Sequence, residues 1–253
     1  MIKVLGISKQ YGAKKVLDEV SADFPTKKLV AFIGSNGAGK STLLSIITRT
    51  LGKNEGEVLV EGKALERWKN RELAKKLSVL KQSNHLTIRI KVRELVGFGR
   101  FPYSHGHLTA EDEEKIDEAI SYTGLEALEN RYLDELSGGQ RQMAYIAMVI
   151  AQDTDYIFLD EPLNNLDMKH SVQIMTILKR LVHERGKTVM VVIHDINFVS
   201  HYADYIVAMK DGKIVAGGET DEMMNSHTLE QIYGMNIEVR KINDRNVCLY
   251  YSA

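Results

Sequence analysis

The chain has 253 residues, 44 % of them hydrophobic, which is enough to bury a sizeable core without disulfides or metals. Its 33 Lys and Arg residues balance 34 Asp and Glu residues, giving a formal net charge of −1, and no polybasic cluster is present. Charge alone therefore does not hold this chain to nucleic acid or to an anionic lipid surface.

Cysteine content and apolar runs indicate the compartment. The single Cys248 cannot form an intrachain disulfide, and the opening residues MIKVLGISKQ lack the apolar stretch of a secretory signal. The longest apolar runs, residues 143–151 and 189–193, are shorter than the ~20 residues that cross a bilayer. We expect a cytosolic chain that reaches a membrane only through a protein partner.

The first part of the chain is rich in predicted strands. Apolar or alternating runs cover residues 2–8, 16–24, 29–34, 57–63 and 77–82. A first helix is predicted between Thr42 and Leu51. This pattern predicts mixed and antiparallel β structure around a first nucleotide site.

The middle of the chain changes to helical patterns. Helices are predicted at residues 91–100, from the N-cap Thr109 to Gly124, and after the glycine pair at 138 and 139. Next come a strand at 156–160, a helix over 168–185 closed by Gly186, and a strand at 188–193. The spacing of these three elements suits a parallel crossover.

These patterns predict an α/β fold in three regions. Residues 1–83 and 152–220 form a catalytic core with a β subdomain, residues 84–151 form a helical subdomain, and residues 221–253 form an extension that packs on the core. The Asp211-Gly212 pair indicates a hairpin, and a short helix followed by a second hairpin ends the chain. An alternative is that the segment after Glu219 merely covers the sheet.

Residues 34–42, GSNGAGKST, match the phosphate-loop pattern G-x-x-x-x-G-K-[ST] between an apolar strand and a helix. Successive backbone N–H groups and the helix N-terminus can bind phosphate oxygens, Lys40 can reach the β- and γ-phosphates, and the Ser41 hydroxyl can bind Mg²⁺. The predicted nucleotide contacts are Gly34, Ser35, Asn36, Gly37, Ala38, Gly39, Lys40, Ser41 and Thr42. A GTPase would be expected to carry N-K-x-D, which we do not find, whereas a kinase remains open at this point.

Polar residues follow three predicted strands. The strand YIFLD ends in Asp160, a candidate ligand of Mg²⁺, and Glu161, which can polarise an attacking water. The strand before His194 should neighbour YIFLD and place this side chain near a γ-phosphate. Gln82 ends a third strand, where its amide can contact Mg²⁺ or water.

The stretch LSGGQRQ, residues 136–142, places a second glycine pair before a helix, although the chain already has a phosphate loop. A glycine pair opening a helix is a second potential anion site. If two copies pack head to tail, Ser137, Gly138 and Gly139 of one copy can close over the γ-phosphate held by the other. ATP would then lie between two copies.

The order of phosphate loop, Gln82, LSGGQ, YIFLDEP, NNLD and His194 resembles the ATP-binding cassette (ABC) ATPases over residues 1–220. The resemblance implies a P-loop NTPase fold, the cofactors ATP and Mg²⁺, and a homodimer. It also implies that Tyr11 stacks on adenine, that Glu161 is the catalytic base, that Gln140 belongs to the signature, and that Asp167 couples the two sites. Stacking of this kind contributes ~1–3 kcal/mol, so Tyr11 would tune affinity.

The stretch VRELVGFGRFPY, residues 92–103, resembles the cassette subunits of iron–siderophore, haem and cobalamin importers, and EPLNNLDMKH favours the siderophore branch, including petrobactin-like catecholates. The resemblance implies permease subunits above the cassette, a substrate-binding protein in the assembly, and a place on the cytoplasmic face of the membrane. Asn164 and Met143 depart from the residues common in the superfamily. Phe98, Phe101 and Tyr103 either serve the permease groove or belong to the core of the helical subdomain.

Two other functions are less consistent with the sequence. Nucleic-acid-associated cassette ATPases usually carry a long coiled coil between phosphate loop and signature, or two cassettes in one chain, and neither is present here. A metal site of His85, His105 and His107 would rest on three histidines without a fixed geometry, which is weak evidence. We therefore expect neither nucleic acid nor a histidine-bound metal as a partner.

Overall fold

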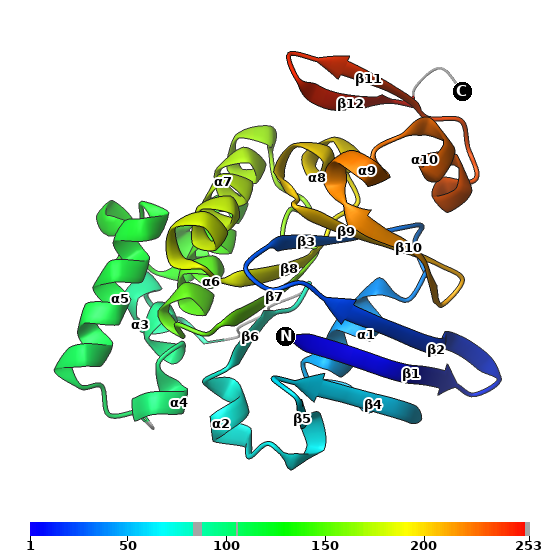
Figure 1. Cartoon of the computed structure of the whole chain (residues 1–253). Coiled ribbons are helices and arrows are strands. Elements are labelled where there is room, and N and C mark those ends of the chain that lie inside the picture. Colours follow the sequence, from blue (N-terminus) through cyan, green and yellow to red (C-terminus); the bar gives the residue numbers. More distant parts are fainter. Residues whose placement is uncertain (83–87, 105, 251–253) are drawn as a thin grey trace.

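The computed structural model of the chain describes residues 1–82, 88–104 and 106–250 (Figure 1). The strands are β1 Ile2–Tyr11, β2 Lys14–Phe24, β3 Leu29–Ile33, β4 Glu55–Val60, β5 Lys63–Ala64, β6 Leu77–Leu80, β7 Tyr156–Asp160, β8 Thr188–Val192, β9 Tyr205–Lys210, β10 Lys213–Glu219, β11 Glu238–Ile242 and β12 Arg245–Leu249. The α-helices are α1 Lys40–Ile47, α2 Asn70–Ala74, α3 Val92–Phe98, α4 Phe101–Ser104, α5 Ala110–Thr123, α6 Gly138–Ala151, α7 Met168–Arg185, α8 Ile196–Tyr202, α9 Thr220–Met223 and α10 Ser226–Tyr233.

The central sheet has the strand order β10-β9-β3-β8-β7-β6. Every pair from β9 to β6 is parallel, and β10 is antiparallel to β9 at the edge. All residues of β3, β7 and β8 are buried, as expected for a parallel sheet covered on both faces. The carboxyl ends of β3, β6, β7 and β8 consequently meet at one edge of this sheet.

Alternate residues of the central strands belong to two separate cores. On β7, Ile157 and Leu159 pack with α5, α6, α7 and α8, while Tyr156 and Phe158 pack with α1 and the antiparallel sheet. That second sheet has the order β2-β1-β4-β5. The period of two in strand side chains thus places α1 and its preceding loop between the two sheets.

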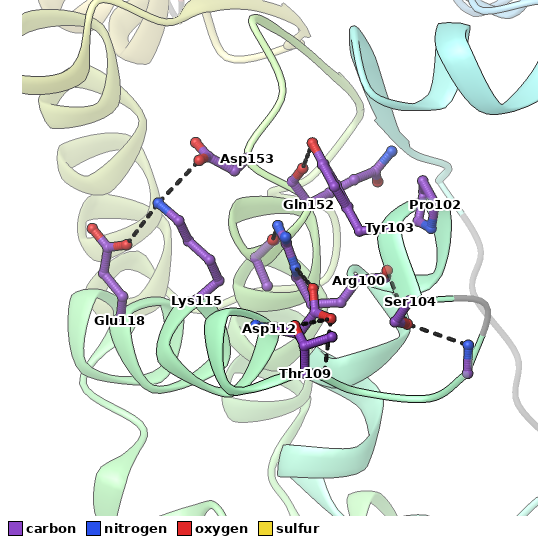
Figure 2. A network of polar contacts seen from close by, with 12 residues as sticks. Arg100, Pro102, Tyr103, Ser104, Thr109, Asp112, Lys115, Glu118, Gln152 and Asp153 are labelled. Carbon is purple, nitrogen blue, oxygen red and sulfur yellow. Dashed lines mark hydrogen bonds and ion pairs between the residues drawn. The ribbon is translucent and has the colours of Figure 1, made fainter.

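The helical region α3–α6 contains a buried ion pair (Figure 2). The side chains of Arg100 and Asp112 are 3 % and 4 % exposed, and Nε of Arg100 lies 2.8 Å from Oδ1 of Asp112. Arg100 Nη1 also donates to the carbonyl of Ala151, at 2.9 Å. At the end of α6, Gln152 Nε2 donates to the carbonyl of Ala74, at 2.6 Å, which connects this region to the core of the chain.

Several element boundaries differ from those predicted. The first helix begins at Lys40 and ends at Ile47, because the phosphate-loop turn leads directly into it and Arg49 has a positive φ of 58°. The helix predicted over 91–100 is confirmed as α3, Val92–Phe98, and a further short helix that was not predicted, α4, follows at Phe101–Ser104. The caps at Thr109, Gly124 and Gly186 and both C-terminal hairpins are confirmed. The division into three regions stays a prediction.

The exposed hydrophobic residues correct one interpretation. Phe98 and Phe101 are 49 % and 61 % exposed, so the alternative that both belong to the core of the helical region is wrong. Tyr103 is half-buried, and its hydroxyl donates to the carbonyl of Gln152, at 3.1 Å. Within the ranges the structure describes, helices are too short or too polar to cross a bilayer.

Candidate functional site

The phosphate loop connects β3 to α1 in a conformation that requires glycine. Gly34 has φ of 133°, and a Cβ atom there would lie 2.0 Å from the carbonyl oxygen of Met209 on β9. Gly39 has φ of 100°, and a Cβ there would lie 2.7 Å from Cδ2 of Leu17. The loop is therefore held tightly between β9 and β2, and a side chain at either position would displace it.

Lys40 lies under this loop. Its Nζ donates to the carbonyls of Gly34 and Ser35, at 2.8 and 2.9 Å, and the side chain is buried. Burial lowers the pKa of Lys40, while the nearby carboxylates of Glu161 and Asp160 oppose that shift. Within the described residues no side chain caps the start of α1, so its first N–H groups face the loop. This arrangement suits an anion with several oxygens.

The loop, Glu161 and His194 line one cavity. It has a volume of about 130 Å³, and its lining is Val16, Asn36, Gly37, Ala38, Gly39, Lys40, Ser41, Thr42, Glu161 and His194. The structure thus brings most of the predicted phosphate contacts, Lys40 among them, together with the predicted catalytic residues Glu161 and His194. Of the predicted phosphate contacts, Gly34 and Ser35 are not among the lining residues, and their carbonyls accept from Lys40.

Ser41 and Asp160 meet beside this cavity. The Ser41 hydroxyl donates to Oδ1 of Asp160, at 2.7 Å. Burial raises the pKa of Asp160, and the neighbouring charge of Glu161 raises it further, against the lowering effects of Ser41, Lys40 and His194. The two oxygen-bearing side chains come from the start of α1 and the end of β7. Oxygen donors of this kind are those that Mg²⁺ prefers.

Glu161 is contacted by three polar side chains. Its backbone has φ of 50°, which turns it away from the direction of β7. Its Oε1 lies 2.7 Å from Nε2 of His194, and its Oε2 accepts from Nε2 of Gln82, at 2.7 Å, and from the amide of Asn164. Three separate loops therefore fix one carboxylate at the edge of the cavity.

The two signature glycines have different surroundings. A Cβ at Gly139 would lie 2.3 Å from Cγ of His170 on α7, whereas a Cβ at Gly138 would meet nothing within 4 Å. Ser137 and Gln140 form a capping box at the start of α6: the Ser137 hydroxyl accepts from the Gln140 N–H, and the Gln140 side chain accepts from the Ser137 N–H. Gly138 therefore presents an open face of backbone.

Asp167 links this region to α7. Its carboxylate accepts from the backbone N–H of His170, at 2.8 Å, and lies 2.9 Å from Nδ1 of the same residue. The backbone hydrogen bond from His170 is the main reason that the pKa of Asp167 is lowered, and the imidazole adds to it. The carboxylate thus orients the ring that packs on Gly139.

Some predicted residues lie outside the cavity lining. Tyr11 is 52 % exposed at the end of β1, where the chain turns into β2. Ser137, Gly138, Gly139, Gln140 and Asp167 are likewise absent from the residues that line the phosphate cavity in the described chain. Of the histidines weighed as a metal site, His85 and His105 lie outside the described residues.

Sequence reasoning missed three residues that contact this site. Asn164 departs from the residue common in the superfamily, yet its amide donates to Glu161. The Gln142 side chain donates to the carbonyl of Pro162, at 3.0 Å, and so connects α6 to the turn after β7. His170 packs on Gly139. Its position two residues into α7 was visible, but no local pattern indicated the contact.

Comparison with known proteins identifies the family. The family model described as "ABC transporter" matches residues 17–164, which include the phosphate loop, the signature and the turn after β7. The chain belongs to the ABC transporter family. This ABC chain is a nucleotide-binding ATPase subunit, as the sequence resemblance predicted.

Two relatives of this ABC chain carry names that specify a cargo. The petrobactin import ATP-binding protein YclP of Bacillus subtilis (strain 168) is 56 % identical over 100 % of both chains. The petrobactin import ATP-binding protein FatE of Bacillus anthracis is 50 % identical over 95 % of this chain and 96 % of its own.

A solved structure supports the fold and indicates an assembly. The dimeric post-hydrolysis state of the ATP-binding cassette MJ0796, bound to ADP and Pi, has a TM-score of 0.77 and 31 % identity to this chain. The match covers 87 % of this chain and 99 % of that one. ABC cassettes of this fold therefore form dimers, in agreement with the predicted ABC-type P-loop NTPase fold.

Proposed function

We propose that this chain is the ATP-hydrolysing subunit that energises an importer of an iron–siderophore complex. The observation that carries the cargo class is the full-length similarity to the petrobactin import ATP-binding proteins, at 56 % and 50 % identity. The ferric enterobactin transport ATP-binding protein FepC of Escherichia coli (strain K12), at 37 % identity, supports the broader siderophore class. Haem and cobalamin importers are the alternative for the same assembly.

The residue roles follow from the site. Lys40 and the N–H groups at the start of α1 bind the phosphates, since these residues line the cavity. Glu161 is the base that orients and deprotonates the attacking water, and His194, Gln82 and Asn164 hold its carboxylate. The mutual contacts of these side chains support one catalytic unit.

Mg²⁺ fits the oxygen donors next to the loop. The Ser41 hydroxyl and the Asp160 carboxylate would hold it, with the Gln82 amide as a further contact, because a hard cation takes a few protein oxygens together with those of the substrate phosphates. When bound, the ion neutralises charge that develops on the phosphate oxygens. The role of this chain is to supply and orient those donors.

A second copy completes the site. Gly138 presents open backbone at the start of α6, and the Ser137 hydroxyl lies beside it, so both can approach the nucleotide held by a partner copy. Asp167 and His170 lie behind that surface and connect it to the turn that carries Glu161. Tyr11 is exposed and available to stack on adenine.

An exposed apolar cavity supports docking of a permease. It has a volume of about 450 Å³, and its lining is Arg93, Glu94, Gly97, Phe98, Phe101, Ser104, Gly106, Leu108, Glu113 and Ile116. Two half-exposed phenylalanines on α3 and α4 form an apolar rim of the kind that protein partners cover. We place the chain on the cytoplasmic face of the membrane, under permease subunits that work with a substrate-binding protein.

The test is uptake of radioactive iron in a bacterial strain lacking this chain and its relatives. Strains that regain ferric petrobactin uptake with the wild type, but not with Lys40→Ala, would support the proposal. The doubly substituted F98D/F101D variant should hydrolyse ATP but lose uptake and co-purification with the permease. Val215→Asp, which changes an equally exposed apolar residue on β10, is the control and should retain both.

These experiments test the identity of the transported molecule separately from ATP hydrolysis. Uptake of haem or cobalamin, with no uptake of any ferric siderophore, would replace the cargo and leave the ATPase unchanged. Normal uptake by F98D/F101D would remove the cavity on α3 and α4 from permease docking. Absence of ATP hydrolysis in the purified wild type, both alone and with its permease, would contradict the function as a whole.

A further inference from the structure

The β11–β12 hairpin lies against α8, the helix that follows His194 (Figure 1). Cys248 on β12 and Val199 on α8 are both buried, and they belong to the same hydrophobic core. The hairpin is therefore packed directly beside the segment that carries one of the proposed catalytic side chains.

Two side chains of α8, Asn197 and Ser200, form hydrogen bonds with the backbone of β12. The Asn197 side chain accepts from the N–H of Cys248, at 2.8 Å, and donates to the carbonyl of the same residue, at 3.2 Å. The Ser200 hydroxyl donates to the carbonyl of Asn246, at 2.8 Å. Alternate residues of an antiparallel strand direct their backbone polar groups to the same side, so those of Asn246 and Cys248 both face α8. Side chains of α8 therefore take the place of a further strand at this edge.

Asn197 also contacts the residue next to His194. The backbone N–H of Asn197 donates to Oδ1 of Asp195, at 2.8 Å, and this bond caps the start of α8. The Nε2 atom of His194 in turn lies 2.7 Å from Oε1 of Glu161. A single residue thus joins the hairpin, through its side chain, to the turn that carries His194, through its backbone.

The contacts of Asn197 indicate a role in holding structure rather than in binding a ligand. Both the oxygen and the nitrogen of its amide are bonded to Cys248, and in the described chain Asn197 does not line the phosphate cavity. Cys248 is 1 % exposed, so water cannot readily replace the amide as a partner for its backbone groups. Without the amide, the hairpin and α8 can shift relative to each other, and the turn before α8 moves with the helix.

We propose that Asn197 is a positioning residue for His194: its amide ties the turn before α8 to the hairpin and so keeps the imidazole in contact with Glu161. The inference rests on the catalytic roles of His194 and Glu161 in the proposed function and is independent of the cargo. A displacement of ~1 Å in a catalytic group can lower a rate by ~10²-fold. The effect falls on the rate of hydrolysis and not on nucleotide affinity, because the phosphate loop is left intact.

The experiment measures Asn197→Ala in two backgrounds, the wild type and His194→Ala. A residue that acts through the imidazole loses its effect once the imidazole is removed, whereas a general loss of stability slows hydrolysis in both backgrounds. Ser200→Ala, which removes one hydrogen bond to β12, is a milder second variant. Thr123→Val removes a buried hydroxyl and its hydrogen bond within α5, and it is the control for stability.

Three quantities are measured for each variant: the rate constant of hydrolysis in a single turnover, the Kd for a fluorescent ATP analogue, and the Tm. We expect Asn197→Ala to lower the rate constant about tenfold in the wild-type background and less than twofold in His194→Ala, with Kd within a factor of two. Ser200→Ala should lower the rate constant about threefold in the wild-type background. Thr123→Val should lower Tm and leave the rate constant unchanged.

An unaltered rate constant in Asn197→Ala would overturn the proposal, as would an equal loss in the two backgrounds or an equal loss in Thr123→Val. If Asn197→Ala does not fold, Ser200→Ala decides the same comparison, and an unaltered rate constant there would overturn the proposal. A wild-type rate in His194→Ala would contradict the catalytic role of His194 in the proposed function, and this inference with it. A slow His194→Ala beside an unaltered Asn197→Ala would contradict the positioning role alone.

Discussion

The imidazole of His170 lies so close to Gly139 that even one methyl group at residue 139 would stand 2.3 Å from the ring. Gly138, the residue before it, has open space around the same position. Glycine is therefore present at these two adjacent positions for different physical reasons. Gly139 is required by packing inside this chain, and Gly138 leaves backbone free for a group that comes from outside.

Gly139→Ala should destabilise the chain and Gly138→Ala should not. Inserting a methyl group against His170 costs about 1–3 kcal/mol, because the ring is held by Asp167 and cannot move freely. At Gly138 alanine fits and favours the helix by ~0.5–1 kcal/mol. Thermal unfolding of the two variants measures the difference in Tm.

The same pair separates folding from catalysis. Gly138→Ala should lower ATP hydrolysis at least tenfold, although its Tm is equal to or above that of the wild type, since its methyl group would occupy the face offered to a partner's nucleotide. As a control, His170→Ala should relieve the clash in Gly139→Ala and restore part of its Tm. Full activity in Gly138→Ala would show that nothing approaches this backbone.

Glu161→Gln should still bind ATP but hydrolyse it about 10²–10⁴-fold more slowly, the usual contribution of a general base. The amide has the same shape and can keep hydrogen bonds to Gln82 and His194, so the site should stay assembled. Single-turnover ATPase measurements give the rate, and light scattering with ATP should show dimers that persist.

A matched substitution controls for loss of charge. Glu111→Gln removes an exposed carboxylate at the start of α5 and should leave hydrolysis unchanged. If Glu161→Gln turned over ATP within tenfold of the wild type, another group would have to take the proton from water.

Asp160→Asn should stabilise the free chain while abolishing hydrolysis. Burial and the charge of Glu161 raise the folded-state pKa of Asp160 above its unfolded value, so ionisation of this group costs folding free energy at any pH above that folded pKa. The asparagine carbonyl can still accept from the Ser41 hydroxyl. At pH 7.5 we expect Tm to rise by about 2–4 °C, the shift that ~1 kcal/mol produces in a chain of this size.

The pH dependence of Tm tests the sign of the stabilisation expected for Asp160→Asn. As the pH falls through the raised pKa, wild-type Asp160 becomes neutral, and the advantage of Asn should disappear. A Tm series from pH 7.5 to pH 4 therefore measures a gain that shrinks toward acid. A variant less stable than the wild type at pH 7.5 would show that the charge of Asp160 favours the fold.

Much of the site was predictable because it is encoded locally. Three local patterns each indicate the end of a strand: the glycines and lysine of the phosphate loop, the apolar run before Asp160 and the strand before His194. Parallel strands bring such ends to one edge of the sheet. The caps at Thr109 and Gly186 were predicted for the same reason, since a cap depends on neighbouring residues.

The contacts that were missed join segments far apart in the chain. His170 against Gly139 and Gln142 at the carbonyl of Pro162 depend on how elements pack, and no periodicity in the sequence specifies those pairs. The exposure of Phe98 and Phe101 was likewise not predictable from the sequence. Their apolar character was compatible with a core, and only the packing of α3 and α4 leaves them exposed.

The buried charges of Arg100 and Asp112 (Figure 2) should stabilise the fold as a pair, whereas either charge left alone should destabilise it. Arg100→Met leaves the Asp112 carboxylate buried without a cation and should destabilise the chain by about 3–5 kcal/mol. The doubly substituted R100M/D112N variant removes both charges, while the asparagine side chain can still accept from the backbone N–H of Thr109, the N-cap residue of α5. It should recover at least half of the lost stability in urea unfolding.

The coupling energy from this double-mutant cycle decides between two roles of the network. A coupling of at least ~1 kcal/mol shows that the two charges act together, as their 2.8 Å separation and near-complete burial require. Additive losses would instead assign the cost to the separate hydrogen bonds, from Arg100 to the Ala151 carbonyl and from Thr109 to Asp112. Lys115→Met, which breaks partly exposed ion pairs with Glu118 and Asp153 in the same view, is the control and should cost less than ~1 kcal/mol, as ion pairs near the surface do.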